Sequence, residues 1–207
     1  MTQVLSIHPT HPQQRLLRKA VEVLHKGGLV VYPTDTTYAL ACHIGDKAAL
    51  ARLVALRRLH KHHQFTLACR DLREIGTYAR VDNMDYRLLK RCTPGPFTFI
   101  LRATREVPKR LVHEKRRTIG IRVPANPLAQ ELLALHDEPL MTTTLRLPDA
   151  EEPLLDADSI LAELGKQVDL ILDSGNCGNV PSTVIDLTGE LPEVIRQGLG
   201  EVDFLDQ

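Results

Sequence analysis

The sequence lacks tryptophan, has only four tyrosines and four phenylalanines, and shows no excess of charge of either sign. Its 26 lysine and arginine residues balance 26 aspartate and glutamate residues over 207 positions. A balanced charge predicts neither a nucleic acid nor a membrane as the partner of the molecule as a whole. Any preference for an anion must therefore come from a local group of side chains.

Cysteine is also scarce, since the four cysteines lie far apart and form no C-x-x-C pair. The sequence shows no secretory leader and no long apolar span near its N-terminus. We therefore expect a reduced, cytoplasmic protein with no membrane partner and no zinc site. The one histidine cluster, His60, His62 and His63, lacks the i,i+4 spacing and nearby carboxylate of a metal site, so we expect a structural or surface role for it.

The composition is that of an ordinary globular protein, with 43% hydrophobic and 25% charged residues. Apolar runs of strand length alternate with amphipathic segments of helix length. We predict helices at Pro12 to Lys26, Asp46 to Leu59, Met84 to Arg91, Pro127 to Leu135 and Asp158 to Leu164. We predict strands at Leu29 to Pro33, Phe65 to Cys69, Phe97 to Ala103, Thr118 to Pro124, Pro139 to Thr144, Asp169 to Ser174 and Thr183 to Leu187.

Hairpin-length and helix-length connections are mixed in this pattern. It predicts a single α/β (α+β) domain over residues 1–207, in which helices flank a twisted mixed sheet. Neither a P-loop nor a G-x-G-x-x-G motif is present, which excludes a Walker or Rossmann nucleotide site.

Four segments place threonine or serine hydroxyls beside a proline or a predicted strand end: YPTDTTYALAC, TPGPFTFIL, MTTTLRLP and VPSTVIDL. Hydroxyls and backbone amides at such positions can both reach a ligand. Turns and caps explain any one such segment. The four segments together favour a binding site at which hydroxyls from different strands converge.

Basic residues concentrate in KRLVHEKRR, residues 109–117, where Glu114 alone opposes five cations. Arginine binds phosphate oxygens with both arms of its guanidinium, so the run suits a nucleotide or an RNA backbone, and a solvated surface is the alternative. Arg122 differs, because it lies inside the apolar strand IGIRV, where a cation needs a partner. The candidate RNA contacts are Lys109, Arg110, Lys115, Arg116 and Arg117.

Covalent catalysis has no candidate, because the sequence has no G-x-S-x-G motif and no cysteine beside a helix start with a base. Asp35 and Asp186 are the carboxylates nearest to the threonine-rich segments. Either could hold Mg²⁺ together with phosphates, since Mg²⁺ takes one or two carboxylates and keeps several waters. A cap or turn role is the alternative for each, and the sequence assigns no metal ligand with certainty.

Five segments, taken in chain order, resemble the motifs of the YrdC/YciO family of threonylcarbamoyl-AMP synthase-like proteins, and more closely those of its YciO branch. They are YPTDTTYALAC, TPGPFTFIL, IGIRVP, PSTVIDL and VIRQG. The similarity runs from about Val4 to Leu199. It implies a YrdC-like fold in which a twisted sheet surrounds a large, positively charged cavity that has been linked to double-stranded RNA and nucleotides.

Synthases of this family make threonylcarbamoyl-AMP from L-threonine, bicarbonate and ATP with Mg²⁺, as a step towards the t6A modification of tRNA. The resemblance thus implies ATP or AMP and L-threonine as ligands, with Mg²⁺ accompanying ATP and with no zinc, haem or flavin. The residues implied for threonine are Thr34, Thr36, Thr183 and Arg122. Those implied for the nucleotide or its phosphates are Arg57, Arg58, Lys61, Thr98, Thr144, Arg146, Ser182 and Arg196.

Two motifs of the synthases are altered in this chain. Where synthases carry K-x-R at the end of the second helix, LRRLHKHHQ has Arg57 and Leu59, and where they carry S-x-N, MTTTLRL has Thr144 and Arg146. Three hypotheses therefore stay open. The chain is a synthase-like enzyme, a non-catalytic protein that binds tRNA, rRNA or double-stranded RNA, or a nucleotide sensor or hydrolase.

Overall fold

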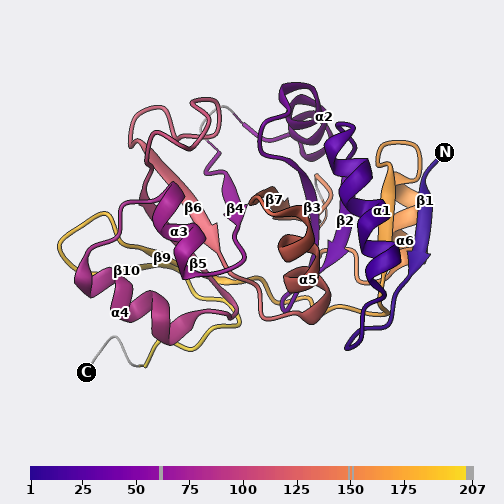
Figure 1. Cartoon of the computed structure of the whole chain (residues 1–207). Coiled ribbons are helices and arrows are strands. Elements are labelled where there is room, and N and C mark those ends of the chain that lie inside the picture. The colour runs from indigo at the N-terminus through magenta and orange to yellow at the C-terminus, as the bar shows by residue number, and fades with distance from the viewer. Residues whose placement is uncertain (61–62, 149, 151, 204–207) are drawn as a thin grey trace.

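The structure is a computed structural model that describes residues 1–60, 63–148, 150 and 152–203. Within these residues, one mixed sheet has the strand order β1-β8-β2-β3-β7-β4-β6-β5-β9-β10 (Figure 1). The strands are β1 (Gln3–Ser6), β2 (Val30–Pro33), β3 (Tyr38–His43), β4 (Thr66–Ala68), β5 (Phe97–Arg102), β6 (Thr118–Arg122), β7 (Leu140–Thr144), β8 (Leu170–Asp173), β9 (Thr183–Asp186) and β10 (Glu193–Arg196). The predicted mixed α/β sheet is confirmed.

Parallel and antiparallel pairs alternate irregularly across this sheet. The pairs β1–β8, β8–β2, β4–β6 and β5–β9 are parallel. The pairs β2–β3, β3–β7, β7–β4, β6–β5 and β9–β10 are antiparallel. This arrangement places β4, β5 and β6, which come from the middle of the chain, between strands from its two ends (Figure 1).

Side-chain caps fix where most of the helices begin. The side chains of Asp46, Asp71, Asp82, Asn126 and Asp156 each accept a hydrogen bond from a backbone N–H in the first turn of the following helix. The helices are α1 (Gln14–His25), α2 (Lys47–Arg57), α3 (Leu72–Tyr78), α4 (Asn83–Cys92), α5 (Pro127–His136) and α6 (Ala157–Leu164). None of the helices in the described residues is long and apolar enough to cross a membrane.

The predicted strands and helices are all present, but four elements were not predicted. The strand β1 and the exposed edge strand β10 have only four residues each, and the helix α3 has seven, so their periodicity is weak. The strand β3 is buried along most of both faces and therefore lacks the alternation of a half-exposed strand.

The sheet buries two apolar cores, one on each face. Successive residues of β2 show this, because Val31 joins one core while Val30 and Tyr32 join the other. The larger core contains residues of α2, α3, α4 and α6. The smaller core contains residues of α1 and α5, which lie side by side on the second face (Figure 1).

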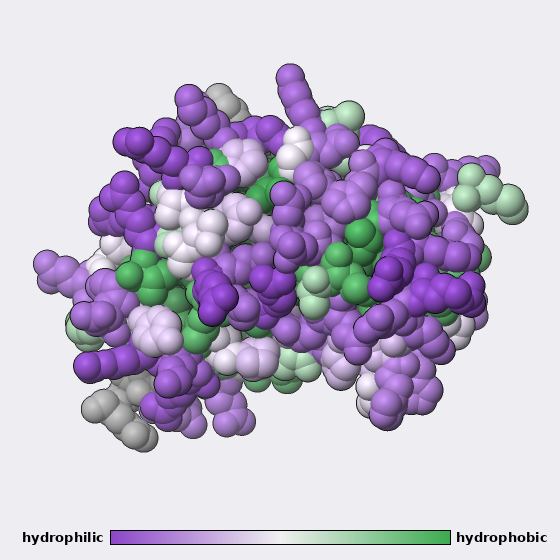
Figure 2. Space-filling model, viewed as in Figure 1, coloured by the Kyte–Doolittle hydropathy of each residue, from purple (hydrophilic) through white to green (hydrophobic). Residues whose placement is uncertain are grey.

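The helices α1 and α5 cover only part of this second face. Their core reaches as far as Leu140 of β7 and Ala68 of β4. Beyond these residues, the same face of β7, β4, β6, β5 and β9 carries polar side chains, and it forms the floor of the cavity described below. The view in Figure 2 shows a surface that is mainly hydrophilic, with scattered apolar side chains, so large apolar groups are concentrated in the two cores.

Candidate functional site

A cavity of about 280 Å³ lies over the uncovered part of the second sheet face. Its floor is set by strand register, since Thr144 lies opposite Ala39, Thr142 lies opposite Thr66, and Thr98 pairs with Val184. Side chains alternate along a strand, so the same strands bury apolar residues in the larger core on their other face. The lining residues are Thr37, Ala39, His63, Gln64, Thr66, Thr98, Ile100, Arg122, Thr142, Thr143, Thr144, Ser182, Val184, Ile195 and Arg196.

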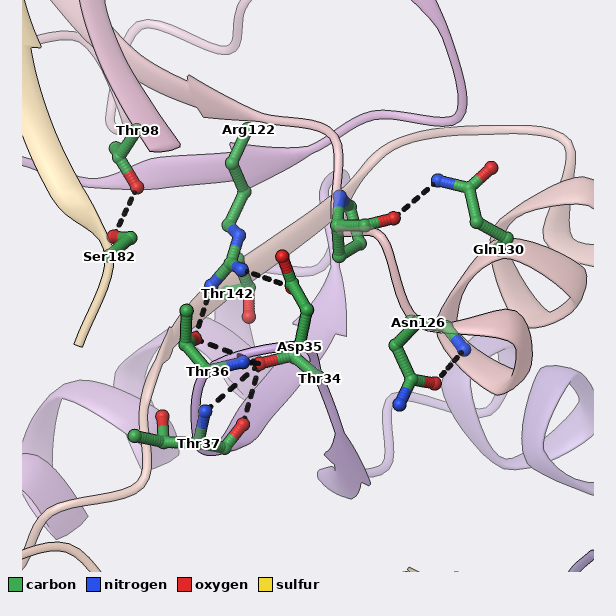
Figure 3. Close-up of polar contacts among 12 residues, drawn as sticks. Thr34, Asp35, Thr36, Thr37, Thr98, Arg122, Asn126, Gln130, Thr142 and Ser182 are labelled. Carbon is green, nitrogen blue, oxygen red and sulfur yellow. Dashed lines mark hydrogen bonds and ion pairs between the residues drawn. The ribbon is translucent and has the colours of Figure 1, made fainter. Parts of the chain in front are cut away.

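Hydroxyls from distant segments meet in this cavity, as the four threonine-rich motifs suggested. The Thr98 Oγ1 atom lies 2.8 Å from Ser182 Oγ, across the β5–β9 pair (Figure 3). The Thr142 Oγ1 atom lies 3.1 Å from the buried Tyr32 hydroxyl. Among the residues proposed from the sequence, Thr98, Arg122, Thr144, Ser182 and Arg196 line the cavity.

Arg122 ends β6 and finds its partner in the loop before β3. Its Nη2 atom donates to Asp35 Oδ1 at 2.7 Å, and its Nη1 atom donates to Thr36 Oγ1 at 3.3 Å (Figure 3). The two side chains of the ion pair are only 9% and 12% exposed. Within the described residues, Arg122 Nε and Asp35 Oδ2 are buried and have no hydrogen-bond partner. Such atoms are uncommon in folded proteins, and a bound ligand is one explanation for them.

Thr34 holds the loop that presents Asp35. Its hydroxyl donates to Thr37 O at 2.6 Å and accepts from the backbone N–H groups of Thr36 and Thr37 at 3.2 and 3.3 Å. In the described part of the chain, Thr37 lines the cavity, whereas Thr34 and Thr36 are buried behind it. Two of the three threonines proposed for the substrate thus have structural contacts here, since Thr34 holds the loop that carries Asp35 and Thr36 accepts from Arg122.

Thr183 and Arg196 occupy different environments, although both were proposed from the sequence. The Thr183 hydroxyl donates to Gly200 O at 2.6 Å, and its side chain is fully buried, so it is directed at the backbone and not at the cavity. Arg196 lines the cavity and donates to Ser182 O at 2.8 Å through Nη2. Although Arg196 lies on the exposed strand β10, partial burial of its guanidinium lowers its pKa, and the nearby charge of Arg122 lowers it further.

The cations at the end of α2 separate in the structure. Burial and the charge of Arg146 lower the pKa of Arg57, whose Nε atom is buried with no hydrogen-bond partner in the described residues. Arg146 is exposed and donates from Nε to Ala150 O at 2.8 Å. Arg58 has a left-handed backbone (φ 46°) that ends the helix, and its side chain lines a separate cavity beside α6. Lys61 lies outside the described residues.

His63 and Gln64 line the cavity, although the sequence suggested only a structural or surface role for the histidine cluster. Burial lowers the pKa of His63 to about 4, and the charges of His60 and Arg57 contribute to this shift. His62 lies outside the described residues. Sequence reasoning missed His63 because it lies three residues before β4 begins at Thr66, outside the period-2 pattern that marks one face of a strand.

The two carboxylates suggested for Mg²⁺ each have a protein partner in the structure. Asp35 is paired with Arg122, and Asp186 Oδ1 accepts from Thr188 Oγ1 at 2.6 Å and from the Thr188 N–H at 2.8 Å. Among the described residues, the cavity lining contains two arginines and neither aspartate nor glutamate. These contacts suit an anionic ligand better than a metal ion held by the protein.

The basic run at residues 109–117 forms no helix and is divided in space. Three of its members, Lys109, Arg116 and Arg117, line a groove of about 650 Å³ near the ends of β5 and β6 that lie away from Arg122. Arg110 instead donates to Ile44 O at 3.0 Å and also to Gly45 O, and Lys115 is exposed outside the groove lining as described. The other basic residues that line the groove are Arg80, Arg102 and Arg105.

Comparison with known proteins finds similarity over almost the whole chain. The Sua5/YciO/YrdC family model, described as telomere recombination, matches residues 22–198. The uncharacterized protein YciO of Escherichia coli K12 is 54% identical over 202 residues, which are 98% of each chain. The crystal structure of E. coli YciO matches with a TM-score of 0.95 over 98% of each chain.

Two more distant proteins also match. A putative threonylcarbamoyl-AMP synthase of Methanocaldococcus jannaschii is 29% identical over 201 residues, covering 95% of this chain and 93% of that protein. The structure of P. abyssi Sua5 complexed with L-threonine matches with a TM-score of 0.87 at 24% identity, over 95% of this chain and 58% of that one. At 24% identity, the similarity to P. abyssi Sua5 shows only that the two proteins share a fold.

The Arg122–Asp35 pair is predicted to be strongly coupled. Replacing Arg122 with alanine leaves a buried carboxylate uncompensated, so we expect the free energy of unfolding to fall by about 3–5 kcal/mol. The double variant Arg122→Ala/Asp35→Ala should lose at least about 1 kcal/mol less than the sum of the single variants. Urea unfolding of the four proteins measures this coupling.

The exposed ion pair between Arg70 and Asp137 provides the comparison, since its charged atoms are 2.9 Å apart. Its arginine and aspartate side chains are 36% and 81% exposed, so Arg70→Ala should cost only about 0–1 kcal/mol. Additive losses for Arg122→Ala and Asp35→Ala would show that the buried pair does not hold the site together.

The low pKa of His63 predicts a pH-dependent stability. Between pH 6.5 and 4 the unfolded chain binds a proton at this histidine that the folded chain does not, so stability falls on acidification. From pH 7 to pH 5 the wild type should lose about 1–2 kcal/mol more than His63→Gln, measured by urea unfolding. Equal losses in the two proteins would contradict the assigned environment of His63.

Proposed function

Because the chain belongs to the Sua5/YciO/YrdC family, we propose that its cavity binds a nucleoside phosphate together with L-threonine or a related amino acid. The observation that carries this proposal is the cavity lining, which combines hydroxyls from several strands with Arg122 and Arg196. Hydroxyls and guanidinium groups are the donors that phosphate and carboxylate oxygens require. The putative synthase relative and the threonine complex of Sua5 support the same choice of ligands.

The arrangement of cations supports an anionic ligand. Burial is the largest cause of the lowered pKa values of Arg196, Arg57 and His63. Neighbouring cations lower them further, namely Arg122 for Arg196, Arg146 for Arg57, and His60 and Arg57 for His63. These smaller contributions are repulsions between positive charges. A phosphate group among them would replace repulsion by attraction, and this electrostatic gain would favour binding.

The Arg122–Asp35 pair suits the amino acid. The carboxylate of a free amino acid is opposite in charge to the Arg122 guanidinium, which lines the cavity, and Asp35 holds that guanidinium in place from outside the lining. Arg122 lines the cavity beside Thr98 and Ser182, whose hydroxyls can bind a third polar group such as the threonine hydroxyl. We assign the amino acid to the position beside Arg122 and the phosphates to the space between Arg196 and His63.

The volume of the cavity limits how much of the two ligands it can enclose. About 280 Å³ lies just below the range of about 300–1,000 Å³ that is usual for drug-sized ligands. It accommodates an amino acid and a reacting phosphate, and the nucleoside would extend over the exposed strand β10, where Ile195 lines the cavity rim.

In the proposed reaction, the amino nitrogen of threonine first adds to bicarbonate with loss of water and forms a carbamate. A carbamate oxygen then attacks the α-phosphorus of ATP, the bond to the β-phosphate oxygen breaks, and pyrophosphate leaves. The protein aligns the reactants and neutralises charge, which requires no covalent side chain. Mg²⁺ would enter bound to ATP, as part of the substrate.

The basic groove supports RNA binding as a second candidate function. Six cationic side chains line it, and three of them, Lys109, Arg116 and Arg117, belong to the basic run of the sequence. A cationic groove of this kind binds phosphate backbones without reading sequence. In this hypothesis the groove would hold an RNA whose modification uses the product of the cavity.

The synthase proposal predicts pyrophosphate release from ATP and Mg²⁺ that depends on both L-threonine and bicarbonate. Arg196→Ala should lower kcat/KM for ATP by about 10- to 100-fold, because one charge-assisted hydrogen bond to phosphate is lost. A coupled pyrophosphate assay with purified protein measures both effects.

Arg18→Ala is the matched control, since Arg18 is an exposed arginine of α1 outside the cavity lining described above. It should retain wild-type kcat/KM. Pyrophosphate release that does not depend on threonine would contradict the synthase proposal. Equal losses of kcat/KM in Arg196→Ala and Arg18→Ala would also contradict it. Nucleotide binding without pyrophosphate release would favour the alternative that the protein is a nucleotide sensor.

RNA binding at the groove predicts an affinity that falls with salt, because phosphate contacts release counterions. For a double-stranded RNA of random sequence, Lys109→Ala/Arg116→Ala should weaken binding and reduce the slope of log K against log salt by about 1–2. Lys115→Ala, from the same run but outside the groove lining as described, should have little effect. Fluorescence anisotropy at several salt concentrations separates these outcomes, and equal effects of the two substitutions would refute the groove as the site.

A further inference from the structure

Three histidines from distant parts of the sequence meet away from the cavity. His25 ends α1, His43 ends β3 and His136 ends α5, and each offers a ring nitrogen within 4.8 Å of the other two. The rings of His25 and His136 are stacked with centroids 4.9 Å apart, and His43 approaches His136 edge-on at 5.4 Å. The packing of α1 against α5 on the sheet brings these three element ends together (Figure 1).

The hydrogen bonds of His136 leave one nitrogen free to bind. Its Nδ1 atom lies 2.9 Å from Glu138 O, and because a carbonyl only accepts, Nδ1 carries the proton. In the neutral ring, Nε2 therefore holds a lone pair. His136 is 3% exposed, and its Nε2 atom is buried with no hydrogen-bond partner among the described residues. An Nδ1–H bond to a backbone carbonyl is the contact that commonly orients a metal-binding histidine.

The contacts of His43 bring a carboxylate to the same place. Its Nδ1 atom accepts from the Gly45 N–H at 2.9 Å, so Nε2 faces Glu138 Oε2 at 2.8 Å. A cation that replaced the proton between these two atoms would contact one imidazole and one carboxylate. Glu138 thus supplies both the carbonyl that orients His136 and a carboxylate beside His43.

From these contacts we propose that His25, His43 and His136 bind one divalent transition-metal ion, with the Glu138 carboxylate as the fourth ligand. Three imidazoles and a carboxylate form a donor set that suits Zn²⁺, and also Co²⁺, Ni²⁺ or Cu²⁺. The C-terminal ends of α1 and α5 add partial negative charge near the ion. The exposed side chain of His25 leaves the ion a path from solvent.

The distances require only small adjustments. Three nitrogens that all lie within 4.8 Å of one another fit inside a circle of radius about 2.8 Å, whereas Zn–N bonds measure about 2.0–2.1 Å. Shifts of less than about 1 Å per nitrogen therefore bring the three imidazoles to bonding distance, and the exposed His25 side chain is free to rotate for its part of this adjustment. Packing of aromatic rings explains the stack of His25 on His136, but it gives no reason for a buried Nε2 without a partner.

The proposed metal site contradicts the expectation from the sequence that the protein has no zinc site. That prediction rested on cysteine spacing and on the local cluster at His60, His62 and His63, and neither reports on residues that only the fold brings together. None of the three histidines of the proposed site lines the threonine-rich cavity in the described residues. The metal proposal therefore does not rest on the proposed function.

The test uses the tag-free full chain after treatment with a chelator and its removal. Titration with Co²⁺, followed by visible absorption and calorimetry, should show one ion per chain with the intense absorption of four-coordinate Co²⁺, and Zn²⁺ should displace it. Because His25 is exposed, His25→Ala should keep the fold while it lowers Co²⁺ affinity at least 10-fold. Glu138→Gln should lower the affinity by about 10- to 100-fold.

The surface pair His8 and His11, with ring centroids 5.3 Å apart, provides the matched control. His8→Ala/His11→Ala should bind Co²⁺ as the wild type does, and circular dichroism in chelator should show the same thermal unfolding for all variants. The proposal is overturned if no stoichiometric ion binds, if His25→Ala and His43→Ala both bind Co²⁺ as tightly as the wild type, or if only the His8/His11 variant loses binding.

Discussion

The buried ion pair between Arg122 and Asp35 is the interaction on which the candidate site depends. Removing two charges from water costs several kcal/mol for each ion, so such a pair persists only where close contacts compensate it. Here the contacts come from the loop that Thr34 closes and from the Thr36 hydroxyl that Arg122 binds. The fold thereby holds a guanidinium and a carboxylate at fixed positions beside a face lined with hydroxyls. Two buried polar atoms of the pair find no partner among the described residues, and this favours binding over stability as the reason for the pair.

Strand alternation explains how one sheet provides both a core and a site. Residues such as Ile119 and Ile121 enter the larger core, while Arg122 and the threonines of neighbouring strands face the other way. The helices α1 and α5 cover the second face only as far as β7 and β4, so the polar part stays accessible. Family membership and the putative synthase relative support the proposal that phosphate and carboxylate groups bind among the cations of this cavity.

Sequence patterns were sufficient for the mixed sheet and for much of the cavity. Apolar runs marked the long elements, and the position of Arg122 inside an apolar strand correctly indicated a buried cation that needs a partner. Sequence patterns did not predict the direction of a side chain where hydrogen bonds or backbone conformation determine it. The hydroxyls of Thr34 and Thr183 donate to nearby backbone carbonyls. The left-handed backbone of Arg58 directs its side chain to another cavity. Arg110 donates to the backbone carbonyl of Ile44 and does not line the basic groove. The cluster of His25, His43 and His136 exists only in the folded chain, so neither spacing nor composition could reveal it.

The central claim is that the threonine-rich face beside Arg122 binds a nucleotide and an amino acid together. A crystal structure of the protein with L-threonine and a non-hydrolysable ATP analogue tests it most directly. We expect the amino-acid carboxylate beside Arg122 and the phosphates between Arg196 and His63, over the floor formed by β7, β4, β6 and β5. Ligand bound only in the basic groove near Lys109, or an empty cavity at saturating ligand, would contradict it.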